Sequence, residues 1–152
     1  MNGKNNKKVL CFGTFDLFHL GHVSFLRQAR KYGNYLVVVV ARDENVKKIK
    51  GKYPLDNELK RIENLKKSKL GDNVILGKEK FSYSIIKEID PDIICLGYDQ
   101  KVDEKKLQSE LRSKKEYSGV KKVYNKKIVR LLPYKENIYK SSKLNKQKNR
   151  KF

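Results

Sequence analysis

The sequence predicts an α/β fold in which helices cover both faces of one parallel sheet. Short runs of Val, Ile and Leu recur along the 152 residues, as is typical of strands that are buried on both faces. Segments with apolar residues at helical spacing alternate with these runs. Such alternation indicates βαβ units with right-handed crossovers. We therefore expect a single domain built on a doubly wound, Rossmann-like parallel sheet of about five strands.

Five segments have the composition of buried strands. One contains four consecutive valines, and another is bounded by Pro91 and Gly97. The expected strands span residues 8–12, 35–41, 73–76, 92–96 and 127–132. Ligands of doubly wound sheets bind outside the carboxyl ends of the strands, so we expect the functional residues to follow these segments directly.

Four segments between the strands carry apolar residues at helical spacing. Gly33 ends the first of them, because glycine is favoured just after a helix. Asp56 is the expected N-cap of the second helix. The buried stripe of that helix is expected to be Leu59, Ile62 and Leu65. The expected helices span residues 22–32, 57–67, 83–89 and 103–113.

Two segments do not fit this alternation. Residues 113–127 are charged, and we expect an insertion with a short strand of its own. Residues 140–152 carry six cations and no acidic residue, which indicates a helix that frays into solvent. The expected domain spans residues 1–142, followed by a basic helix or tail at residues 143–152.

Composition excludes several classes of protein. The longest wholly apolar run is residues 36–41, whereas a membrane span needs about twenty residues, so we expect no integral membrane protein. No long apolar stretch follows the N-terminus, which argues against a signal peptide. Cys11 and Cys95 lie within apolar runs and are expected to be buried, reduced thiols. We therefore expect a cytoplasmic protein.

The net charge of +20 is the strongest compositional signal. A field of that size attracts polyanions, which include nucleotides, nucleic acids and anionic membranes. The cations are spread over nearly every segment, however, and a general lysine bias explains the charge without any partner. We favour this second explanation, and expect neither nucleic acid nor a membrane as a partner.

Both histidines of the chain lie in one stretch, GTFDLFHLGH at residues 13–22. It begins where the first expected strand ends and finishes where the first expected helix starts. Free backbone N–H groups and the helix dipole make such a turn an anion site. Gly13 permits a sharp turn, and Gly21 removes a side chain between His19 and His22. We therefore expect both imidazoles to contact the same phosphate groups.

This stretch resembles the GTFD…HxGH signature of the cytidylyltransferase-like nucleotidyltransferases. The resemblance extends over residues 9–144 and includes four further elements. They are residues 41–51 after the second strand, Arg61 on the next helix, residues 96–100 after the fourth strand, and residues 141–144 before a final helix. Within the family, the elements at residues 41–51 and 96–100 most resemble the small archaeal-type FAD synthetases, which are FMN adenylyltransferases.

A related group, the glycerol-3-phosphate cytidylyltransferases, is the alternative within the family. Its members have an Arg-Thr-Glu-Gly-Ile-Ser-Thr-Thr stretch before the last helix. This chain has Lys135 in place of the arginine and Ile138 in place of the glycine, which disfavours that alternative. The motifs do not distinguish ATP from CTP as the nucleoside triphosphate. A different alternative is a non-catalytic nucleotide- or RNA-binding module, suggested by the basic residues 143–151.

The resemblance implies nucleotidyl transfer. A phosphate oxygen of the acceptor attacks the α-phosphorus of a nucleoside triphosphate, and pyrophosphate leaves. The acceptor phosphate is largely dianionic at neutral pH, so no general base is required. FMN is the expected acceptor and ATP the expected donor, with Mg²⁺ bridging phosphate oxygens. The resemblance also implies a homodimer.

Four side chains are the expected catalytic residues: His19, His22, Lys50 and Arg61. The imidazoles would donate hydrogen bonds to the triphosphate, and Lys50 would reach the phosphates from a flexible loop at residues 50–53. Arg61 resembles an arginine of the family. Two structural alternatives stay open: the lysine belongs to a solvated charge run, or Arg61 pairs with Glu58.

The expected nucleotide-binding residues follow the first, fourth and fifth strands. They are Gly13, Thr14, Phe15, Asp16, Gly21, Gly97, Tyr98, Asp99, Gln100, Lys135, Ser141 and Ser142. Three roles fit Asp16: holding a divalent metal ion, orienting His22, or capping the loop. Tyr98 offers a ring for stacking on a base or a flavin, or packs in the core, and Ser141 is an N-cap or a phosphate ligand.

Overall fold

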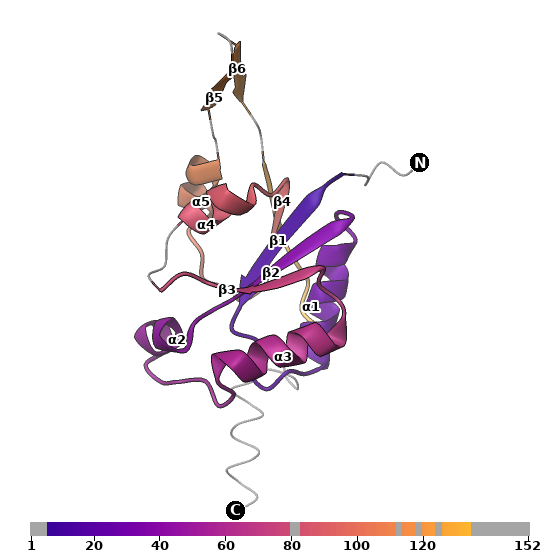
Figure 1. Cartoon of the computed structure of the whole chain (residues 1–152), viewed down its shortest axis with the longest axis vertical. Helices are drawn as coiled ribbons and strands as arrows, with labels where there is room; N and C mark the ends of the chain where they lie inside the picture. Colours follow the sequence, from indigo (N-terminus) through magenta and orange to yellow (C-terminus); the bar gives the residue numbers. More distant parts are fainter. Residues whose placement is uncertain (1–5, 80–82, 112–113, 118–119, 124–125, 135–152) are drawn as a thin grey trace, which may run out of the picture.

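Five parallel strands form the central sheet of the computed structural model, which describes residues 6–79, 83–111, 114–117, 120–123 and 126–134 (Figure 1). The strands are β1 (Lys8–Gly13), β2 (Tyr35–Val40), β3 (Asn73–Leu76), β4 (Ile93–Leu96) and β7 (Lys127–Arg130). Their order in the sheet is β3-β2-β1-β4-β7, and every neighbouring pair is parallel. The predicted fold class, a Rossmann-like α/β domain, is confirmed.

The switch point of this sheet lies between β1 and β4. The chain builds outward from β1 through β2 to β3, then returns to add β4 and β7 on the other side. Cys11 is the register partner of Cys95, so the ends of β1 and β4 reach the same edge side by side. Ligands of doubly wound sheets bind at such a point. The topology therefore brings together the residues that follow Gly13 and Leu96.

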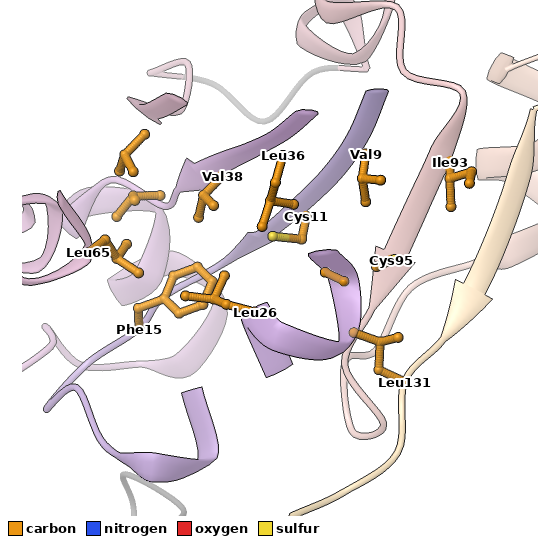
Figure 2. Close-up of a cluster of buried hydrophobic side chains, with 13 residues drawn as sticks. Val9, Cys11, Phe15, Leu26, Leu36, Val38, Leu65, Ile93, Cys95 and Leu131 are labelled. Atoms are coloured by element: carbon orange, nitrogen blue, oxygen red, sulfur yellow. The ribbon is translucent and has the colours of Figure 1, made fainter. Parts of the chain in front are cut away.

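Helices cover both faces of the sheet, as Figure 1 shows. Their bounds are Leu20–Arg30 for α1, Asp43–Lys50 for α2, Glu58–Ser68 for α3, Ser84–Ile89 for α4 and Glu104–Leu111 for α5. Leu26 of α1 and Leu65 of α3 share one buried cluster with Val9, Cys11 and Cys95 (Figure 2). Ile86 of α4 and Leu107 of α5 belong to a second cluster, which includes Leu10. Alternate residues of β1 thus serve opposite faces.

Four details of the predicted helices are wrong. The first helix, α1, ends at Arg30 with Lys31 as its C-cap, and not at Gly33. Leu59 is 72% exposed, and the buried stripe of α3 contains Arg61 in its place. The N-cap of α3 is Asn57, whose side chain accepts from the Lys60 N–H at 2.9 Å, because the Asp56 backbone is bound by other groups. The helix α2 was not expected; of its eight residues only Val46 is buried, so it gives almost no apolar pattern.

The insertion at residues 113–127 forms two strands, where the sequence predicted one. β5 (Lys114–Tyr117) and β6 (Val120–Val123) pair as an antiparallel hairpin that is separate from the main sheet and projects from one end of the molecule (Figure 1). The prediction of a basic tail at residues 143–152, and with it the domain boundary, lies outside the described residues. In the described part of the chain, no helix combines the length and the apolar character that crossing a membrane requires.

Both cysteines are buried and free, as predicted. Burial raises the pKa of the Cys95 thiol to about 12, and it raises the pKa of Cys11 well above its ordinary value. Thiols in this state are protonated at neutral pH and unreactive. Cys11 and Cys95 therefore act as small apolar side chains in the core.

The exposures of two leucines on α3 make a matched test of this packing. Leu65 is 1% exposed, so Leu65→Ala should lower the free energy of unfolding by about 2–5 kcal/mol through lost burial and a cavity. Leu59→Ala removes the same atoms from a side chain that is 72% exposed, and should stay within about 0.5 kcal/mol of the wild type. Urea denaturation of the three proteins measures both. Equal losses in the two variants would contradict the packing of α3.

Candidate active site

The two histidines form a reciprocal cap at the start of α1. His19 is the N-cap residue, and its Nδ1 accepts from the Gly21 N–H at 3.0 Å. The Nδ1 of His22 in turn accepts from the His19 N–H at 3.3 Å. Because each Nδ1 is an acceptor, a neutral ring must carry its proton on Nε2. Helix capping thus fixes the tautomer of both rings and leaves each Nε2–H as a donor.

Aromatic neighbours hold the His22 ring in one orientation. The rings of His19 and His22 stack with centroids 3.8 Å apart, and Phe18 stacks on His22 at 5.6 Å. Phe15 meets His22 edge to face at 5.5 Å. These contacts preorganise the donor, because little rotation is left to lose when a ligand binds.

Both imidazoles are neutral at physiological pH. Burial lowers the pKa of His19, and burial together with the nearby His19 and Lys50 lowers the pKa of His22 to about 3. Neutral rings donate through Nε2–H without adding charge to the site. The positive charge for binding phosphates must therefore come from other groups, namely lysines, backbone N–H groups and the start of α1.

The loop between β1 and α1 is tightly folded. Phe15 and Leu17 have left-handed backbone conformations, with φ of 57° and 49°, which non-glycine residues adopt at a cost. A β-carbon on Gly13 would lie 3.1 Å from the Phe15 ring, which is 5% exposed. Gly13 is therefore needed so that Phe15 can fold under the loop beside His22.

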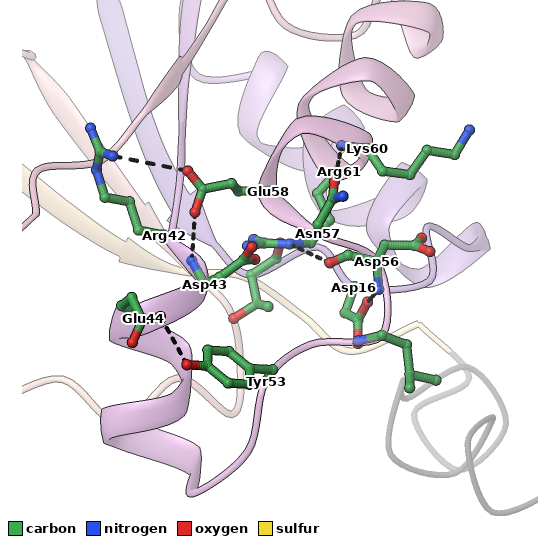
Figure 3. Close-up of polar contacts among 12 residues, drawn as sticks. Asp16, Arg42, Asp43, Glu44, Tyr53, Asp56, Asn57, Glu58, Lys60 and Arg61 are labelled. Carbon is green, nitrogen blue, oxygen red and sulfur yellow. Dashed lines mark hydrogen bonds and ion pairs between the residues drawn. The ribbon is translucent and has the colours of Figure 1, made fainter.

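Arg61 is fully buried and fastens three segments of the site together (Figure 3). Its Nη1 donates to the Thr14 carbonyl at 2.8 Å and its Nε to the Asp56 carbonyl at 3.0 Å. Its Nη2 pairs with Asp43 Oδ1 at 2.7 Å. The structure shows this pair and not the pair with Glu58 that the sequence left open. The guanidinium positions the Thr14 loop, and its predicted catalytic role stays a prediction.

Asp16 holds the segment that precedes α3. Its carboxylate is 8% exposed and accepts from the backbone N–H groups of Leu55 at 2.9 Å and Asp56 at 2.8 Å (Figure 3). Of the three roles that fit the sequence, the structure shows a capping role. Among the described residues, no group of three or more His, Cys, Asp or Glu side chains is arranged to hold a metal ion.

Lys50 reaches the same loop from the end of α2. Its Nζ lies 3.3 Å from Thr14 Oγ1, and its charge acts on His22. Gly51 ends the helix with a φ of 82°, a conformation that glycine adopts freely. The segment after the helix is bound back to α2, because the Tyr53 hydroxyl donates to Glu44 at 2.8 Å. The segment predicted as a flexible loop is thus tied to α2, with the lysine at the candidate site.

The turn after β4 is joined to the end of β1 by one side chain. The Oε1 of Gln100 accepts from the Gly97 N–H at 2.7 Å, and its Nε2 donates to the Phe12 carbonyl at 2.7 Å. The amide predicted to contact ribose or base therefore serves the protein at both ends. Tyr98 is half-buried and Asp99 is exposed beside it. Their predicted contacts with a ligand stay predictions.

The structure therefore brings together the residues predicted after β1, Lys50 and the turn after β4. Lys135, Ser141 and Ser142 lie outside the described residues. Sequence reasoning missed Asp43, the half-buried partner of Arg61, and Glu58, which accepts from the Asp43 N–H at 3.1 Å. One signal for Asp43 was available, since it follows the second strand almost directly.

The site thus places two neutral, fixed imidazoles beside a helix start, at the switch point of a parallel sheet. The sequence matches the cytidylyltransferase-like family over residues 10–147. The chain belongs to this family, as the GTFD…HxGH stretch predicted.

Proteins named FAD synthase are similar to this chain over most of their length. The one from Thermococcus sibiricus is 38% identical over 95% of this chain and 93% of its own. The one from Thermoplasma acidophilum is 41% identical over 92% of each chain. A crystal structure from Thermoplasma volcanium, titled as a lipopolysaccharide core biosynthesis protein, is 41% identical, with a TM-score of 0.72 over 84% of this chain and 98% of that chain.

Acid should destabilise this protein through His22. The folded chain holds the pKa of His22 at about 3, whereas 6.5 is ordinary, so between these values the unfolded chain binds more protons. The free energy of unfolding must then fall as pH falls through this window, by at most about 1.4 kcal/mol per pH unit for one group. Urea denaturation between pH 7 and pH 5 measures the slope.

The matched variant is His22→Asn, because its Oδ1 replaces Nδ1 as the acceptor of the cap and does not titrate. We expect a shallower slope for this variant over the same range of pH. Identical slopes for variant and wild type would show that His22 is not held neutral by the fold.

Proposed function

We propose that the chain is an FMN adenylyltransferase, which transfers the AMP group of ATP to FMN and forms FAD and pyrophosphate. The observation that carries the reaction class is the pair of capping bonds at Nδ1, which assigns the proton of each neutral ring to Nε2 at the start of α1. The similarity to proteins named FAD synthase supports FMN as the acceptor. The departures at Lys135 and Ile138 disfavour the alternative acceptor, glycerol phosphate.

The proposed chemistry needs alignment and charge stabilisation only. A phosphate oxygen of FMN attacks the α-phosphorus of ATP, and the bond from that phosphorus to the bridging oxygen of pyrophosphate breaks. The attacking phosphate is largely dianionic at neutral pH, so no proton has to be removed. His19 and His22 donate to the phosphate oxygens on which charge builds, and Lys50 supplies a positive charge beside them.

We propose that Mg²⁺ enters as part of the nucleotide substrate. Asp16 is the nearest carboxylate to the histidine pair along the chain, and both of its oxygens accept backbone N–H groups. The donor set of the described residues is therefore short of carboxylates for a dedicated site. Mg²⁺ is commonly held by phosphate oxygens and water with few protein ligands. Such an ion would neutralise charge on the leaving pyrophosphate.

Several expectations remain proposals. Arg61 would act through the Thr14 carbonyl, Ser141 and Ser142 would contact the β- and γ-phosphates, and Lys135 would bind the nucleotide. A catalytic domain over residues 1–142, a homodimer and a cytoplasmic location also stay predictions. The RNA-binding alternative predicts a salt-dependent gel shift with bulk RNA and no pyrophosphate release.

Product analysis tests the proposed function. The purified chain is incubated with Mg²⁺, with FMN or glycerol phosphate, and with ATP or CTP in turn, and the products are separated with fluorescence detection. We expect FAD and pyrophosphate from FMN and ATP. Consumption of glycerol phosphate but not of FMN would refute FMN as the acceptor. Release of pyrophosphate from CTP but not from ATP would refute ATP as the nucleotide donor.

Asparagine and glutamine variants separate the two functions of each histidine. The Asn side chain places an acceptor near Nδ1 and lacks the distal donor, whereas Gln places a donor near Nε2 and lacks the capping acceptor. His19→Asn and His22→Asn should therefore lower kcat by about 10²-fold or more with little change in Tm. His22→Gln should lose more stability and less activity. The reverse ranking, or wild-type turnover in the Asn variants, contradicts donation through Nε2–H.

A further inference from the structure

Arg130 ends the edge strand β7 and binds the turn that follows β4. Its Nη1 donates to the Gly97 carbonyl at 2.7 Å and to the Gln100 carbonyl at 2.6 Å. Its Nε and Nη2 donate to Glu104 Oε1 at 3.2 Å and 2.6 Å. One guanidinium therefore forms hydrogen bonds with both ends of the turn and with the first residue of α5. Charge-assisted hydrogen bonds in a planar fork fix geometry more strictly than a point charge does.

The same turn is held from the other side by Gln100. Its side chain bonds the Gly97 N–H and the Phe12 carbonyl, and Phe12 immediately precedes the Gly13 turn of the candidate site. The Gln100 N–H also donates to the Gly97 carbonyl at 3.2 Å, which closes a four-residue turn. The turn is thus fixed between the end of β1 and the end of β7.

We propose that Arg130 is a positioning residue that sets the binding of the nucleoside of ATP. This inference rests on the proposed function and on the expectation that the turn after β4 binds the nucleotide. Arg130 bonds to the turn between Gly97 and Gln100 and to the side chain of Glu104, so we expect it to act on the nucleotide through the turn. Glu104 orients the guanidinium and neutralises its charge, so the residue contributes geometry and little net field.

The contacts also restrict how the base is recognised. The Gly97 carbonyl already accepts from Arg130 and from the Gln100 N–H, so both of its lone pairs are used and it is closed to an amino group of a base. The backbone of the central pair, Tyr98 and Asp99, is the part of the turn that would face the nucleoside. Loss of Arg130 would return two carbonyls to solvent or ligand and loosen that central pair.

Kinetics of Arg130→Met, Arg130→Lys and Lys127→Met test the proposal. Lys127 lies on the same strand and is exposed. Lys127→Met removes one positive charge, as Arg130→Met does, and so controls for net charge. We measure kcat, KM for ATP and KM for FMN in the wild type and the three variants. Titration calorimetry adds the ATP affinity, and thermal unfolding adds Tm.

Arg130→Met should raise KM and Kd for ATP by about tenfold, with kcat at saturating ATP and KM for FMN within about twofold. Arg130→Lys should recover part of the affinity, because an ammonium can still bond one carbonyl. Lys127→Met should match the wild type. If Arg130→Met does not fold, Arg130→Lys decides, with a rise of about threefold in KM for ATP expected.

ATP binding within twofold of the wild type in the folded Arg130 variants would overturn the proposal. So would equal losses for ATP and FMN that follow a lowered Tm, since these would mark a merely structural residue. A wild type that binds ATP but makes no FAD would refute the proposed acceptor and leave the ATP titrations as the test of Arg130.

Discussion

The reciprocal cap at the start of α1 is the interaction on which the candidate site depends. It commits both Nδ1 atoms of the histidine pair to backbone N–H groups. Each neutral ring therefore carries its proton on Nε2, and burial keeps the rings neutral. The first N–H groups of every helix need acceptors. In α1 the two histidines supply them through Nδ1, and each Nε2–H is the donor that the proposed function uses.

Around this cap, a buried network converts several polar residues into a scaffold. Arg61 binds the Thr14 carbonyl, Asp16 binds the segment before α3, and Gln100 binds the Phe12 carbonyl. Each of these bonds joins the segment around the end of β1 to a distant element. Because Arg61, Asp16 and Gln100 bond to protein groups, the contacts with phosphate in the proposed function come from the histidines, Lys50 and backbone N–H groups.

The similar proteins and the fold agree on the cytidylyltransferase-like family, although the similar proteins carry different names. Proteins named FAD synthase and a structure titled for lipopolysaccharide core biosynthesis have similar identities to this chain. A fold of this kind hosts many acceptors, because the nucleotide site lies at the switch point and the acceptor meets loops that vary.

Sequence patterns were enough to predict the strands, the main helices and the place of the histidine pair. Those features depend on local patterns: apolar runs, helical spacing, and glycines where a strand turns into a helix. Only the tertiary structure decided that Arg61, Asp16 and Gln100 serve the scaffold, because their partners lie 47, 40 and 88 residues away along the chain. It also decided α2, whose single buried residue gives no periodic signal, since contacts and not propensity stabilise so short a helix.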